Sequence, residues 1–174
     1  MAACNMETPP PTETGTVGIQ FASMPVGTEF HYRASNGDRW ANIYRGKQNG
    51  LHIMETTFAD VGVTHRSFHN DDGLRVKSEG HYGRFNAQVT TYHPHRCVRV
   101  LGSCQMTVRN TGPKESIDTY SSVLKPSGNG YRFTAQKAGG SDQRSSTFRL
   151  GQFNVHTYWS NGDWSERLLK VVTP

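Results

Sequence analysis

The sequence predicts an all-β protein, an antiparallel meander of about nine to twelve short strands that closes into a barrel or folds into a sandwich. Short runs in which apolar and polar residues alternate recur along most of the chain, and such alternation is typical of half-buried strands. Turn-forming pairs such as Asn36-Gly37 and Asn49-Gly50 separate these runs. The runs are not joined by segments with a helical period, which parallel crossovers usually need, so we expect an antiparallel sheet.

The chain divides into a short tail and one domain. Residues 1–16 are polar and include three consecutive prolines, so we expect a disordered tether with little apolar surface to bury. Residues 17–174 have the length of a single all-β domain. Only 34% of the residues are hydrophobic, and no window approaches the roughly 18 consecutive apolar residues of a membrane-spanning helix.

The strands can be placed from the alternating runs and the turns between them. In the run 29–34, Phe30 and Tyr32 alternate with polar residues. Ser35-Asn36-Gly37-Asp38 predicts a type I′ hairpin turn, because Asn-Gly accepts a positive φ at both central positions. We expect strands at 19–22, 29–34, 40–45, 51–58, 63–68, 74–77, 84–92, 118–124, 131–136, 147–158 and 164–172.

Residues 86–110 predict a core hairpin around which the other strands pack. The run has β-branched residues on alternate positions and is broken once, at Gly102-Ser103. Cys97 and Cys104 lie on either side of that break, so an antiparallel return brings them within disulfide reach. A bridge between them closes a loop of about eight residues, which the chain-entropy model values at about 2.5 kcal/mol.

The first four residues carry a resemblance to a known class of protein. Met1-Ala2-Ala3-Cys4, followed at once by the tether, resembles the lipobox of a bacterial lipoprotein, with Met1 in the place where Leu is usual. The resemblance implies that Cys4 is lipidated and that the protein is exported to the periplasmic face of a membrane or to the cell surface. Contact with the membrane would then be through the lipid anchor only. Export agrees with a disulfide, and a cytoplasmic protein with a chance Ala-Ala-Cys is the alternative.

Patterns for catalysis and metal binding are weak. His93 and His95 are two residues apart and share one strand face, but a zinc site needs three or four ligands and Pro94 disrupts regular pairing there. They are therefore only weak metal candidates, and we assign no catalytic residue and no cofactor. No P-loop, dinucleotide fingerprint or Gly-x-Ser-x-Gly elbow is present.

Surface recognition is the function that the composition favours. Residues 31–174 hold 19 Lys and Arg against 11 Asp and Glu, a formal charge of +8, which favours an anionic partner. Aromatic and Arg side chains placed side by side can stack on ligands and neutralise acidic groups. The ligand-binding candidates are Trp40, Arg39, Trp159, Trp164 and Arg167.

We therefore expect a non-catalytic binding or assembly module of the bacterial cell envelope. Its partner would be an anionic lipid, a glycan or another envelope protein, and nucleic acid is disfavoured for an exported protein. The alternative is an envelope hydrolase or a metal-dependent enzyme that uses His93 and His95.

Overall fold

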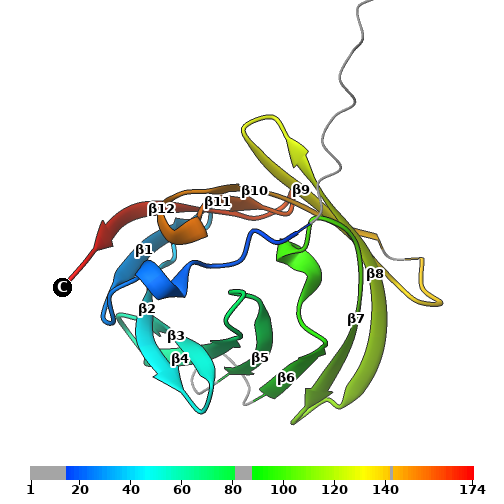
Figure 1. Cartoon of the computed structure of the whole chain (residues 1–174), viewed down its shortest axis with the longest axis horizontal. Helices are drawn as coiled ribbons and strands as arrows, with labels where there is room; N and C mark the ends of the chain where they lie inside the picture. The colour runs from blue at the N-terminus through cyan, green and yellow to red at the C-terminus, as the bar shows by residue number, and fades with distance from the viewer. Residues whose placement is uncertain (1–14, 81–87, 142) are drawn as a thin grey trace, which may run out of the picture.

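The computed structural model describes residues 15–80, 88–141 and 143–174, and within these ranges twelve antiparallel strands close into one barrel (Figure 1). The strands are β1 (Glu29–Ala34), β2 (Arg39–Gln48), β3 (Leu51–Phe58), β4 (Gly62–His69), β5 (Arg75–Gly80), β6 (Gln88–His93), β7 (Gly102–Thr111), β8 (Ser116–Ser127), β9 (Gly130–Lys137), β10 (Gln143–Leu150), β11 (His156–Ser160) and β12 (Ser165–Val172). Three short 3-10 helices accompany them: η1 (Phe21–Ser23), η2 (Cys97–Arg99) and η3 (Gln152–Asn154). None of the described helices has the length and apolar character needed to span a bilayer.

The strands follow one another around the barrel in sequence order, and β12 pairs with β1 to close it. At the closure Phe30 faces Val171 and Arg33 faces Arg167 in antiparallel register. The all-β antiparallel fold predicted from the sequence is therefore confirmed, and the meander forms a barrel rather than a sandwich. Closure leaves no unpaired sheet edge between the first and last strands.

Strand alternation determines which side chains enter the barrel. In β1, Phe30, Tyr32 and Ala34 are buried, while Arg33 between them is exposed. Buried apolar residues gather in two clusters, one on the β7–β10 side around Phe133 and one on the β1–β3 side around Phe30.

Residues 15–24 form an N-terminal plug that crosses one end of the barrel (Figure 1, blue). Its backbone amides donate to three separate segments: Val17 N to Arg99 O at 2.9 Å, Ile19 N to Gly73 O at 3.2 Å and Gln20 N to Phe153 O at 2.9 Å. Val17 belongs to one apolar cluster, and Ile19, Phe21 and Met24 belong to the other. The expected strand at 19–22 is wrong, because this segment is used to fill the barrel rather than to extend its wall.

The plug can pack against the β4–β5 loop only because a glycine on each side allows the two backbones to come into direct contact. A Cβ on Gly18 would lie 1.7 Å from the carbonyl oxygen of Asp72, and one on Gly73 would lie 2.2 Å from the backbone N and O of Ile19. Neither contact is possible for any other residue. The β4–β5 loop and the plug are thus fixed against one another at this crossing.

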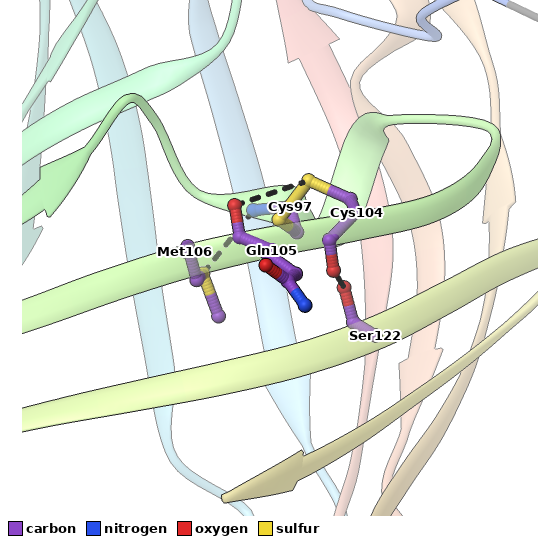
Figure 2. Close-up of a disulfide and its surroundings, with 5 residues drawn as sticks. All are labelled: Cys97, Cys104, Gln105, Met106 and Ser122. Carbon is purple, nitrogen blue, oxygen red and sulfur yellow. Dashed lines mark hydrogen bonds between the residues drawn. A yellow bond between two sulfur atoms is a disulfide. The ribbon is translucent and has the colours of Figure 1, made fainter. Parts of the chain in front are cut away.

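The predicted disulfide joins Cys97 and Cys104, with a Cα–Cα distance of 5.8 Å (Figure 2). An antiparallel pair does form within the predicted hairpin, between β6 and β7, but its turn is misplaced: η2 lies in the connection, and Gly102 and Ser103 begin β7 instead of forming the turn. The bridge therefore fastens a 3-10 turn to the start of β7 instead of joining two strands. Cys97 N donates to the Sδ of Met106 at 3.4 Å, and Ser122 Oγ donates to the carbonyl oxygen of Cys104 at 3.1 Å.

Two further expectations from the sequence need correction. Asn49 and Gly50 both have positive φ, 50° and 79°, as a type I′ turn requires, but Asn36 does not. Its Oδ1 accepts a hydrogen bond from the backbone N of Asp38 at 3.1 Å, which stabilises a different local turn. The expected strand 147–158 is divided between β10 and β11 by η3, where Phe153 has a φ of 57°.

The predicted tether, residues 1–16, falls mostly outside the described residues, as does the start of the strand expected at 84–92. The last two residues of the tether are paired: Gly15 O accepts from Leu101 N at 2.9 Å, and Thr16 forms an isolated bridge with Val100.

Replacing both bridged cysteines, Cys97→Ala with Cys104→Ala, should lower the free energy of unfolding by about 2.5 kcal/mol, because the unfolded chain gains loop entropy. Urea unfolding of the two proteins with and without reductant measures the difference. Reductant should destabilise the wild type and leave the double variant unchanged. Equal stability of oxidised and reduced wild type would contradict a stabilising role for the bridge.

Gly18→Ala should displace the plug, since the added Cβ cannot coexist with Asp72 O. Overpacking of this kind costs about 2 kcal/mol, and hydrogen exchange of the Val17, Ile19 and Gln20 amides should accelerate. Gly50→Ala is the control, because nothing lies within 4 Å of its added Cβ and only its positive φ opposes it. Unchanged exchange at the three plug amides in the Gly18 variant would show that the crossing is not tight.

Candidate functional site: the cavity inside the barrel

A cavity of about 860 Å³ lies inside the barrel. About eight strands already give a barrel whose interior side chains can just fill it, so a wider barrel leaves space unless something else occupies it. The plug fills one end, which we call the plugged end. The cavity extends from there to side chains near the turns of the other end, which we call the opposite end. Its volume is in the range of sites that hold small organic molecules.

Aromatic side chains line the cavity toward the opposite end. Trp40 stacks on Tyr32, Phe58 and Trp164, with ring centroids 5.7, 5.8 and 6.0 Å apart. Trp159 stacks on Phe148 at 5.5 Å. These rings offer a large, rigid apolar surface to a bound molecule.

Three arginines line the cavity at the plugged end: Arg75 at the start of β5, Arg96 just before η2, and Arg99 at its end. The backbone joins two of them, because Arg96 N donates to Arg75 O at 2.7 Å. Arg96 and Arg99 lie at the two ends of η2, and both line the cavity. Arg99 also fixes the plug, since its Nη1 donates to Val17 O at 2.8 Å and to Asn154 O at 2.7 Å.

The three guanidinium groups raise the positive potential around one another. Burial and the neighbouring charge of Arg96 lower the pKa of Arg75 to about 10. Burial, together with the charges of Arg75 and Arg96, lowers the pKa of Arg99 to about 10. Burial by itself would raise the pKa of Tyr92, but the charges of Arg96 and Arg75 and hydrogen bonds from Ser78 and Arg75 bring it below its ordinary value. With pKa values of about 10, Arg75 and Arg99 remain charged at neutral pH.

Neutral polar side chains surround these charges. Ser67 Oγ and His69 Nε2 are 3.0 Å apart in the cavity wall. Burial, followed by the charges of Arg75 and Arg99, holds the pKa of His69 well below its usual range. His69 is therefore neutral and offers hydrogen bonds without adding charge.

Two carboxylates, Asp38 and Glu166, also line the cavity. Glu166 is bound to His156 Nε2, and the His156 ring stacks on Tyr32 at 4.8 Å. His156 thus has the orienting acid that a hydrolase needs. Within the described residues, however, no Ser, Thr or Cys side chain is hydrogen-bonded to its ring, so the nucleophile of a triad does not accompany the pair there.

The ligand-binding candidates that were chosen from the sequence lie on two different faces of the barrel wall. Trp40, Trp159 and Trp164 line the cavity, while Arg39 and Arg167 are exposed on the outer face. The residues next to these arginines, Trp40 and Glu166, point inward. Alternation along β2 and β12 therefore turns the arginines outward.

The outward arginines belong to a row that the sequence analysis missed. Arg33 on β1 is paired with Arg39 on β2 on one side and with Arg167 on β12 on the other. Arg167 is in turn paired with Tyr158 on β11. The guanidinium of Arg149 on β10 lies over the ring of Tyr158, 5.5 Å from its centroid. We call Arg39, Arg33, Arg167 and Arg149 the outer arginine row. All four are exposed, and none forms an ion pair with a carboxylate in the described part of the chain.

The weak metal candidates do not meet other ligands. His93 is exposed and His95 half-buried, and among the described residues no group of three or more His, Cys, Asp or Glu side chains could hold a metal ion. Cys4, the candidate for lipidation, lies outside the described residues.

The cavity arginines were also missed, and a signal for them existed. Arg96 and Arg99 flank Cys97 with the spacing of one 3-10 turn, beside a cysteine that was already expected to be bridged. Comparison of the chain with family models, curated proteins and solved structures finds no significant match, so no family is assigned.

Proposed function

We propose that the protein is a binding protein that holds a small organic molecule in the cavity of its barrel. The observation that supports this proposal is a space of about 860 Å³ that has stacked aromatic rings toward the opposite end and three arginines at the plugged end. Apolar walls with a few converging polar groups are typical of sites for small ligands. The barrel would act as the container and the plug as its base.

A neutral aromatic probe, 1-aminoanthracene, should bind in the cavity and quench tryptophan emission, because all three tryptophans line this space. Thr90→Trp should weaken probe binding at least about tenfold, or ~1.4 kcal/mol, since Thr90 lines the cavity. Thr91→Trp is the matched control, because Thr91 is the next residue of β6 and is exposed. Equal probe affinity in both variants would contradict binding inside the barrel.

We further propose the bacterial cell envelope as the site of action, tethered through Cys4 and in contact with an anionic envelope component. The disulfide supports an oxidising compartment, and the outer arginine row supports an anionic partner. Neighbouring strands are about 4.8 Å apart, so four arginines on five adjacent strands form a line suited to an anionic lipid surface. Like charges placed directly opposite are unfavourable across a sheet, which a partner with negative charge would offset.

Arg39→Glu with Arg167→Glu should weaken binding to vesicles that contain anionic phospholipid at least about tenfold, given ~1 kcal/mol for each basic side chain near such a surface. The effect should diminish as salt is raised, because exposed charges are screened over about 10 Å at 0.1 M. Arg109→Glu with Lys114→Glu makes the same change of net charge at exposed positions of β7 and the β7–β8 loop. If both pairs lose equal affinity in vesicle sedimentation, only net charge matters and the row is not a docking surface.

A further inference from the structure

We infer that the ligand of the cavity is an amphipathic organic anion. Its acidic group binds Arg75, Arg96 and Arg99 at the plugged end, and its apolar body lies along the aromatic side chains toward the opposite end. The inference rests on the proposed function, because it names the class of molecule that the cavity would hold.

Within the described part of the chain, no ion pair neutralises the arginines at the plugged end. Arg75, Arg96 and Arg99 make no ion pair with any carboxylate in the described ranges. The nearby Glu166 is bound to His156 instead, and Asp38 lies close to the β1–β2 turn of the opposite end. Like charges gathered away from bulk water are unfavourable unless an opposite charge joins them.

Arg96 provides the most direct sign of a missing partner. Its backbone N is bonded to Arg75 O, but its guanidinium forms no hydrogen bond or ion pair with another described residue. Arg75, by contrast, is bonded to Tyr92, and Arg99 holds the plug through Val17 O and Asn154 O. A guanidinium with free donors at the base of a cavity can bind a carboxylate or a phosphate in a bidentate manner.

The remaining wall fits the other half of the molecule. Away from the arginines, the cavity is lined by the stacked rings of Trp40, Phe58 and Trp164 and by Trp159 with Phe148. An inorganic anion would leave this aromatic surface unused, and a neutral apolar molecule would leave the arginines without a partner. A molecule with an acidic group at one end and an apolar chain or ring system at the other satisfies both.

The test is competition against bound 1-aminoanthracene by three compounds with the same chain: decanoate, decyl phosphate and 1-decanol. Wild-type protein should prefer each anion to the alcohol at least about tenfold, because hydrogen bonds to charged groups exceed ~1.4 kcal/mol. Whichever anion competes better identifies the headgroup as a carboxylate or a phosphate.

Arg96→Gln should remove most of that preference, measured within the variant as the ratio of its affinities for each anion and for 1-decanol, because the charged donor to the acidic group is lost. Arg75→Gln provides a second variant. Arg39→Gln is the matched control: it loses the same charge from the outer face, where solvent screens it, and should keep the wild-type preference.

The outcomes separate this inference from the proposed function. If the probe does not bind, or Thr90→Trp does not affect it, the cavity is not a binding site and the proposed function fails. If the probe binds but the anions compete no better than 1-decanol, the cavity holds a neutral ligand and only the anion inference is overturned. A preference for the anions that survives in both Arg96→Gln and Arg75→Gln, or is lost equally in Arg39→Gln, overturns the assignment to the cavity arginines.

Discussion

The structure depends on the contact between the N-terminal plug and one end of a barrel that is too wide to fill itself. Strand side chains alone cannot occupy the interior of so wide a barrel, and residues 15–24 supply the missing material at one end. Ile19, Phe21 and Met24 pack with Phe30 and Tyr32 of β1. The plug thereby closes the base of the cavity and leaves the space above it available.

The same contact explains why positive charge gathers at the plugged end of the cavity. The plug and the loops beside it meet through backbone groups, and a buried backbone carbonyl needs a donor. Arg99 satisfies the carbonyls of Val17 and Asn154 from within the barrel. η2, which carries Arg99 and follows Arg96, is held in place by the Cys97–Cys104 bridge. The positive charge at the plugged end is thus part of the structure that closes it.

The strands that form the wall of the barrel could be predicted from the sequence, whereas the segments and side chains that fill its interior could not. Alternation in runs such as 29–34 predicted the strands, and the positions of Cys97 and Cys104 predicted their bridge, because both signals are local. Residues 19–22 of the plug were mistaken for a strand, since the alternation of Ile19 and Phe21 with the polar Gln20 is compatible with a strand, and only the distant partners at Gly73 and Phe153 show the actual use. Alternation should already have separated Arg39 from Trp40, which are adjacent in one strand and therefore face opposite sides. Arg75 joins Arg96 and Arg99 only through the pairing of segments far apart in the chain, which no local pattern reveals.

The hydrogen bonds of the plug also constrain the order in which the molecule can assemble. Val17 bonds to Arg99, Ile19 to Gly73 and Gln20 to Phe153, so the partners of three residues within one short segment are all distant in sequence and come from three separate parts of the chain. A segment at the N-terminus can find these partners only after the strands that carry them have come together, and contacts of such long sequence separation form slowly. We therefore expect residues 15–24 to dock late in folding. Until they dock, water can enter the barrel through the end that the plug will close.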